Sequence, residues 1–188
     1  MEVTWEGGTL SSTYNDDHVQ LRISLADAAK QYDWPRVLSI MEKHPELVNA
    51  WRLDGPSWYA PLHQAASAGA SVATITRLID LGAWRTLQTA CGERAVDIAS
   101  RKGHTHLLEV LAPVYRHRVA PGVLLKIQAH FHAVIRSRAA ALVEEQRLRL
   151  PELDSLLELE TLACGVPCQA CTGDSRTGWS EMHATPRS

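Results

Sequence analysis

The sequence predicts an all-α protein made of stacked helix pairs. The prediction depends on three observations: one stretch of the chain recurs at a fixed distance, apolar residues follow helical spacing, and Gly or Pro stands between the periodic segments. The recurring stretch is APLHQAASAG at residues 60–69, echoed by AVDIASRKGH at residues 95–104, with Leu62 and Val96 34 positions apart. Each copy leads into a second apolar stretch. Such a period indicates a repeat protein, in which each helix pair buries an apolar face against the next pair.

The two copies resemble the ankyrin repeat family, whose pattern is Thr-Pro-Leu-His-x-Ala-Ala-x-x-Gly-His followed by Leu-Leu-x-x-Gly-Ala. Pro61-Leu62-His63 and the later Leu81-Gly82-Ala83 carry the match. Ala60 stands where the family has Thr, and Arg94-Ala95 where it has Thr-Pro, so we expect one hydrogen bond to be missing at the start of each helix that follows. The resemblance implies a solenoid of about three repeats over residues 16–118. It also implies that His63 bonds to backbone groups of neighbouring hairpin loops, called fingers.

The amino-terminal part contains an arm and a first, degenerate repeat. Residues 1–15 are polar and aperiodic, and we expect them to form a mobile arm. Asn15 or Asp16 is placed to cap a first helix, because apolar residues recur at helical spacing over residues 19–31. Pro35 then suits the start of a second helix, where a missing N–H group costs nothing.

Two further repeats follow, separated by fingers. The first finger is expected over residues 51–59, with Asp54-Gly55-Pro56 as its turn. The second repeat covers residues 60–89, and Gly82 is expected to end its second helix in the left-handed conformation. The third repeat covers residues 92–111.

A long helix is predicted within residues 119–150, because apolar positions recur there without a break. The predicted apolar stripe contains Leu124, Ile127, Phe131, Val134, Ile135 and Leu142. A stacked array must cover the exposed face of its last repeat, so we expect this helix to act as a cap. His130 and His132 lie two positions apart, which places them roughly 200° apart on a helix, so they cannot chelate one ion together.

Residues 151–188 are expected to form a short extension and a disordered tail. Residues 155–160 fit either a strand or a last helical turn. After Glu160 the apolar periodicity stops abruptly, which favours a shifted reading frame. Back-translation from Thr161 with two bases dropped, and third positions chosen freely, allows Pro-Arg-Met-Trp-x-Pro-Val-Pro-Gly-Met-Tyr-Gly-Gly-Phe-Ser-Tyr-Arg-Leu. That peptide is typical of structured protein, and sequencing the gene tests the hypothesis.

The tail contains the one group of residues with metal-ligand spacing, Cys164, Cys168, Cys171 and His183. Three thiolates and an imidazole are a reasonable zinc ligand set. The Cys-x3-Cys-x2-Cys spacing also coincides with the cluster motif of radical enzymes that use S-adenosylmethionine. That family places the motif ahead of a large barrel, which does not follow here. Chance occurrence in a disordered tail is favoured, so no metal or cofactor is expected.

Composition and charge exclude several classes of function. The net charge is −2, but residues 101–149 hold 9 Lys and Arg against 3 Asp and Glu. This basic stripe lacks an aromatic or Gly-rich recognition motif, so nucleic-acid binding through Arg136, Arg138, Arg147 and Arg149 is disfavoured. No phosphate loop, nucleophile elbow or metalloprotease motif occurs, and we expect neither an enzyme nor a small-molecule ligand. The first residues lack a basic start and an apolar segment, and no apolar run approaches 18 residues, so we expect neither a secretion signal nor a membrane span. The few cysteines favour a reducing cytoplasm.

The remaining hypothesis is a non-catalytic module that binds another protein. Ankyrin arrays typically bind through finger tips and the exposed side of the first helices. Aromatic residues and Arg most often carry interface energy, and the candidates at these positions are Trp51, Arg52, Trp58, Tyr59, Trp84, Arg85 and Gln88. The tryptophans can equally pack between fingers. The alternative is an ankyrin scaffold that carries a small functional or zinc-binding domain beginning near Leu150.

Overall fold

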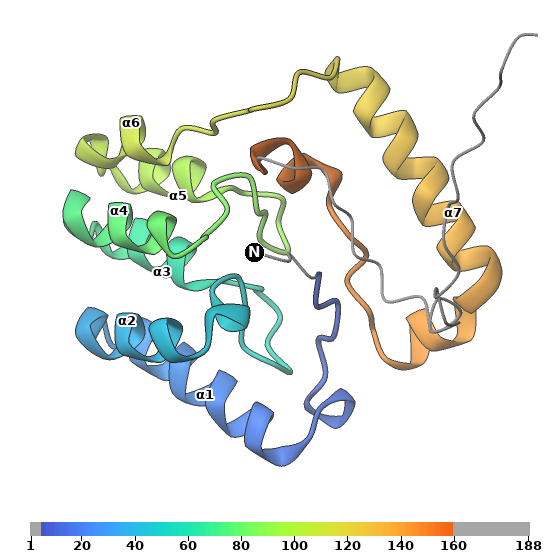
Figure 1. Cartoon of the computed structure of the whole chain (residues 1–188), viewed down its shortest axis with the longest axis horizontal. Coiled ribbons are helices and arrows are strands. Elements are labelled where there is room, and N and C mark those ends of the chain that lie inside the picture. The colour runs from blue at the N-terminus through green and yellow to red at the C-terminus, as the bar shows by residue number, and fades with distance from the viewer. Residues whose placement is uncertain (1–4, 160–188) are drawn as a thin grey trace, which may run out of the picture.

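The computed structural model describes residues 5–159, and within this range the regular elements are helical, which confirms the all-α prediction. Helices lie in three pairs, one above another (Figure 1). The pairs are α1 (Asp16–Lys30) with α2 (Trp34–Lys43), α3 (Pro61–Ala68) with α4 (Val72–Asp80), and α5 (Ala95–Lys102) with α6 (Leu108–Leu111). Short 3-10 turns are formed by Ser11–Thr13, Pro45–Leu47 and Thr105–Leu107.

The helix starts follow from the residues that precede them. Asn15 caps α1, since its side chain accepts a hydrogen bond from the His18 N–H at 2.8 Å, as one of the two predicted alternatives required. At the starts of α3 and α5, neither the Ala60 nor the Arg94 side chain accepts a capping hydrogen bond. The N–H group of Ala60 instead bonds to His63 Nδ1 at 3.1 Å, so a residue inside the first turn satisfies the helix start.

The core lies between two layers of helices. The first helices of the pairs, α1, α3 and α5, pack in one layer, and α2, α4 and α6 pack in the other. Ala65, Ala66 and Ala99 are fully buried, and their small size lets neighbouring first helices approach closely. Leu62, Leu78 and Leu107, which the apolar pattern places in the core, are at most 2% exposed.

A close approach between pairs explains one of the glycines. Gly69 ends α3 with φ +65°, in the left-handed region that an L side chain rarely adopts. A Cβ atom added there would lie 2.6 Å from Cε1 of His104, which belongs to the next pair. Gly82 has φ +103° directly after α4, in agreement with its predicted role at the helix end.

The long helix α7 (Pro121–Glu145) is present, but it does not cover the last helix pair. The connection after α6 carries the chain away, and α7 packs against the 3-10 turn η4 (Leu153–Glu158) on the finger side of the molecule (Figure 1). None of its side chains is buried, and its backbone is kinked at Ala139. Of the predicted stripe, Leu124, Phe131 and Ile135 are half-buried, whereas Ile127, Val134 and Leu142 are at least 50% exposed.

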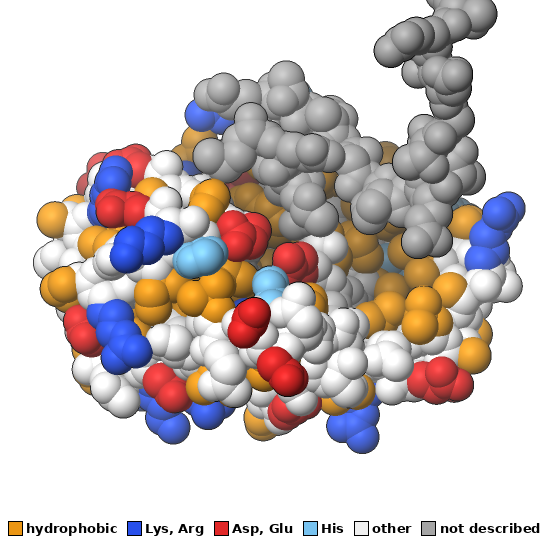
Figure 2. Space-filling view, turned by 60° about the horizontal axis from the view of Figure 1, so that its bottom comes forward, with side chains coloured by type: hydrophobic (Ala, Val, Ile, Leu, Met, Phe, Trp, Pro, Cys, Tyr) orange, Lys and Arg blue, Asp and Glu red, His pale blue; other side chains and the backbone are white. Residues whose placement is uncertain are grey.

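Hydrophobic side chains therefore remain on the surface of α7. Figure 2 shows them gathered on the right-hand part of the visible face, where α7 lies. The most exposed members are Val123, Leu125, Ile127, Val134 and Leu142. The predicted cap on the last helix pair is therefore absent. The residues that follow α7, and not α7 itself, lie against the stacked helix pairs.

We define residues 147–159 as the carboxyl segment. It runs back between the fingers and α7 and ends in η4, so residues 155–158 form a 3-10 turn and not a strand (Figure 1). His132 on α7 bonds to this segment, with Nε2 2.8 Å from the carbonyl oxygen of Pro151. The predicted tail, its cysteines and the reading-frame hypothesis lie outside the described residues.

Candidate functional site

The carboxyl segment binds the second finger, defined as residues 84–94, through acidic side chains. The carboxylate of Glu158 accepts hydrogen bonds from the backbone N–H groups of Arg85 and Thr86, at 3.3 and 2.7 Å, and from the Thr86 hydroxyl. The Glu158 side chain is only 8% exposed. Hydrogen bonds to an ionised acceptor are about twice as strong as neutral ones, so this contact fixes the end of the segment on the finger.

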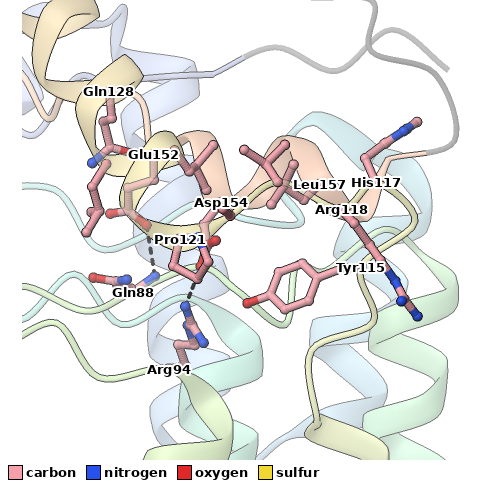
Figure 3. Close-up of a pocket in the computed structure, with 14 residues that line it drawn as sticks. Gln88, Arg94, Tyr115, His117, Arg118, Pro121, Gln128, Glu152, Asp154 and Leu157 are labelled. Carbon is pink, nitrogen blue, oxygen red and sulfur yellow. Dashed lines mark hydrogen bonds and ion pairs between the residues drawn. The ribbon is translucent and has the colours of Figure 1, made fainter.

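Two further carboxylates extend the same contact. Glu152 accepts a hydrogen bond from the backbone N–H of Gln88 at 3.1 Å, and Asp154 pairs with the guanidinium group of Arg94 (Figure 3). Glu152, Asp154 and Glu158 thus all face one edge of the second finger. The finger has an irregular backbone with a single bridge between Gln88 and Arg94, so its N–H groups are available to side chains of another segment.

Arg149 fixes the other end of the segment in a box of indole rings. Its guanidinium carbon lies 5.2, 4.5 and 5.1 Å from the ring centroids of Trp5, Trp51 and Trp58. It also pairs with Glu152. Burial lowers the pKa of Arg149, and the Glu152 charge opposes that shift. Nη1 is buried without a hydrogen-bond acceptor, so cation–π attraction to the ring faces supplies part of its stabilisation.

The amino-terminal arm completes this box. Trp5 stacks on Trp84, with centroids 6.0 Å apart and ring planes inclined by 9°. Its Nε1–H donates to the carbonyl oxygen of Arg149 at 2.9 Å, and the Arg149 N–H donates to the Gly7 carbonyl oxygen at 2.8 Å. The sequence predicts a mobile arm over residues 1–15, whereas the part from Trp5 onward is docked here, because an aromatic side chain and the arm's backbone both find partners.

The structure divides the predicted partner-binding residues into two groups. Trp51 is 4% exposed, and it lies with Trp58 around Arg149. Trp84 lies under Trp5, while Arg85 and Gln88 bond to the carboxyl segment. These five residues therefore contact other parts of the same chain. The remaining two, Arg52 and Tyr59, contact Asp27 and the His63 ring, and neither is bonded to the described part of the arm or to the carboxyl segment.

Arg52 and Tyr59 line a small groove, which we call the open groove. It has a volume of about 160 Å³ and lies between α1, α3 and the first finger. Its lining combines apolar side chains with the polar Lys30, Gln64 and Ser57. Arg52 pairs with Asp27 on α1, and both side chains are nearly half exposed. Arg52 is exposed, whereas Tyr59 is half-buried and packs against the core beside the groove. Arg and Tyr are residue types that often anchor a bound protein.

A larger cavity lies between the second finger and α7 (Figure 3). Its volume is about 700 Å³, within the range of small-molecule pockets. Two of the acid–base pairs described above, Arg94 with Asp154 and Glu152 with Arg149, lie in or next to its wall. The rest of the wall is largely apolar and includes Val119, Pro121, Leu124, Leu125 and Leu157. The expectation of no small-molecule ligand remains a prediction.

His63 joins the first helix layer to the second finger. Its Nδ1 accepts from the Ala60 N–H, so Nε2 carries the proton and donates to the Leu87 carbonyl oxygen at 2.9 Å. Burial lowers the pKa of His63 from 6.5 to about 4; the positive charge of Arg149 adds to this shift, and the bond to Leu87 opposes it. The imidazole is thus neutral in the folded protein near pH 7.

Stability is expected to fall on acidification because of His63. The folded-state pKa of about 4 lies below the value of 6.5 in the unfolded chain, so the unfolded state binds the proton first as the pH falls. Above pH 6.5 His63 makes no pH-dependent contribution; between pH 6.5 and pH 4 it lowers the free energy of unfolding by up to about 3 kcal/mol. Urea unfolding between pH 6.5 and pH 4 should show that the free energy of unfolding depends less on pH in His63→Gln than in wild type. His130→Gln, on the exposed surface of α7, is the matched control, and equal slopes for all three proteins would contradict the prediction.

The sequence did not identify the residues that occupy the second finger. The missed residues are Trp5, Arg149, Glu152, Asp154 and Glu158. A signal was available, because the basic residues 101–149 are followed by an end that holds 6 Asp and Glu against 2 Lys and Arg. Pairing the two blocks would have indicated only the contact of Arg149 with Glu152. The other partners of the acids lie in the second finger, outside residues 101–149.

The chain matches no protein-family model and no curated protein. Across residues 5–159, no helix combines the length and apolar character needed to cross a bilayer. In the same range, no three His, Cys, Asp or Glu side chains come together in a metal-binding arrangement. Cys164, Cys168, Cys171 and His183 lie outside that range, so the zinc hypothesis remains open to metal analysis.

Proposed function

We propose that this chain is an ankyrin-type repeat module that binds another protein in the cytoplasm and catalyses no reaction. Three features support the family assignment: stacked helix pairs with separate layers of first and second helices, left-handed glycines at Gly69 and Gly82, and a buried His63 bonded to the second finger. The family resemblance carried by Pro61-Leu62-His63 agrees with these features. Binding is assigned to the side of the array formed by the first helices.

The observation that carries the proposal is the open groove. Of the seven candidate contact residues, Arg52 and Tyr59 are the two that the amino-terminal arm and the carboxyl segment leave uncovered. The groove lies between two first helices and a finger, where a partner can contact both. Arg52 pairs with Asp27, and both side chains stay nearly half exposed, so the guanidinium group is accessible to a partner.

Replacement of groove residues is expected to weaken partner binding. Arg52→Glu and Tyr59→Ala should each weaken binding by about tenfold or more, because an anchor residue contributes more than about 1 kcal/mol. Lys43→Glu, at the exposed end of α2, is the matched surface control. The full chain and its variants serve as bait in cell extracts. Proteins that wild type and Lys43→Glu capture, but neither groove variant does, are then purified and their affinities are measured by titration.

The proposal has a clear failing outcome. If both groove variants are folded, as judged by circular dichroism, and retain every captured protein at wild-type affinity, the open groove is not the binding surface. Equal loss with Lys43→Glu would show that capture depends on general surface charge and would also contradict the proposal.

A further inference from the structure

We propose that the second finger is a receptor for an acidic, leucine-rich peptide of a partner protein, and that the carboxyl segment occupies this receptor in cis. This surface is separate from the open groove, because it involves residues 85–94 and not Arg52 or Tyr59. Failure of one proposal therefore leaves the other intact.

The receptor recognises carboxylates with backbone groups and with charge. Glu158 is bound by two successive backbone N–H groups and a hydroxyl, at Arg85 and Thr86, and Glu152 by the backbone N–H of Gln88. Adjacent backbone amides of this kind form an anion-binding concavity. Since these donors belong to the backbone, they are present for any segment that offers carboxylates in the same positions.

The occupant matches the receptor in charge and in spacing. Within the carboxyl segment, residues 150–159 contain Glu152, Asp154 and Glu158 and no Lys or Arg, while the receptor presents Arg94 beside the amide groups. Arg149, just before them, lies in the indole box and donates to the Gln88 carbonyl oxygen. Leu157 is buried between the acidic positions, so one leucine side chain adds an apolar anchor. A partner of this class carries carboxylates at relative positions 1, 3 and 7, with leucine at position 6.

Exchange requires residues 150–159 to leave the finger while Arg149 stays in its indole box, and it also breaks the backbone hydrogen bonds from Arg116 and His117 to the Leu157 carbonyl oxygen. The segment is joined to α6 through residues 112–120 and α7, and α7 has no buried side chain. Its main packing partner is η4, which is part of the occupant itself. A tethered occupant competes within the molecule, so a free peptide competes poorly until the cis contact is weakened.

The test is to neutralise the cis carboxylates in the full chain and measure binding of the peptide in trans. The open variant is Glu152→Gln with Asp154→Asn and Glu158→Gln, and the probe is a fluorescein-labelled peptide of residues 150–159. Fluorescence anisotropy should show the probe binding the open variant about tenfold or more tightly than wild type. The reason is that the second finger is more often unoccupied in the open variant, and only an unoccupied finger binds the probe. Glu144→Gln with Glu145→Gln, on exposed positions of α7, is the matched control and should bind as wild type.

Two further measurements define the chemistry of recognition. A probe with Gln and Asn in place of its acids, and an open variant that also carries Arg94→Gln, should both lose binding. The proposal is overturned if the folded open variant binds the probe no better than wild type, or binds the neutral probe equally well. Equal binding of a single-stranded oligonucleotide would show an unselective basic surface and would also overturn it.

A second design covers an open variant that does not fold. A protease site replaces residues 136–138 in the exposed part of α7, and the folded protein is then cut. Exchange of the cut carboxyl fragment for an excess of labelled peptide of residues 147–159 supports the proposal. A fragment that stays bound without exchange shows a permanent part of the fold and overturns it.

Discussion

Replacing Arg149 with Ala is expected to lower the free energy of unfolding by about 3–5 kcal/mol. The guanidinium group is buried, pairs with Glu152 and donates to the Gln88 carbonyl oxygen. Its loss leaves a partly buried carboxylate and a carbonyl group without their donor. The same change opens a space between Trp5 and Trp51, where the cation now lies.

Urea unfolding followed by tryptophan fluorescence measures this effect, since the indole rings surround the substituted group. Arg138→Ala is the matched control, because that side chain is exposed on α7, and its effect should stay within about 0.5 kcal/mol of zero. A loss below about 1 kcal/mol for Arg149→Ala would show that the carboxyl segment contributes little to the folded state.

Truncation of the core in the last helix pair is the second large effect. Leu107 is 0% exposed, so Leu107→Ala removes buried methyl groups and leaves a cavity, at a cost of about 2–5 kcal/mol. In a short array each helix pair is stabilised mainly by its neighbour, so this loss is a large part of the total free energy of unfolding. Thermal unfolding followed by circular dichroism compares the stability of Leu107→Ala with that of wild type.

The chain offers a leucine at the opposite extreme of burial as the control. Leu125 on α7 is 65% exposed, and Leu125→Ala should change stability by less than about 0.5 kcal/mol. Similar losses for both variants would contradict the placement of Leu107 in the core and of Leu125 on the surface.

Local sequence signals predicted the helix pairs well, for physical reasons that act within one repeat. Asn15 caps a helix because its side chain reaches an N–H group three residues later, and Gly82 ends one because it tolerates positive φ. The core leucines follow from 3.6-residue periodicity. Each of these effects depends on residues a few positions apart, so a short stretch of the sequence is enough to predict it.

The candidate site was predicted less completely, because its contacts join distant parts of the chain. Arg52 and Tyr59 were identified by residue type and by their place on the first finger, and they do line the open groove. Trp84, Arg85 and Gln88 were identified on the same grounds, but the amino-terminal arm and the carboxyl segment cover them. Residue type indicates which side chains favour an interface, and it does not indicate which interface they enter.

The sequence by itself determined the all-helical class, the position of α1 to α6, the core leucines and the existence of the long helix. Only the tertiary structure decided where α7 and the carboxyl segment lie. Helical periodicity defines an apolar face without naming what covers it, so the same stripe on α7 was compatible with a cap on α6 or with packing against η4. The contacts of Arg149 with Trp5 and Trp51 decided between them. Those contacts span about a hundred residues or more and depend on chain geometry that no local pattern encodes.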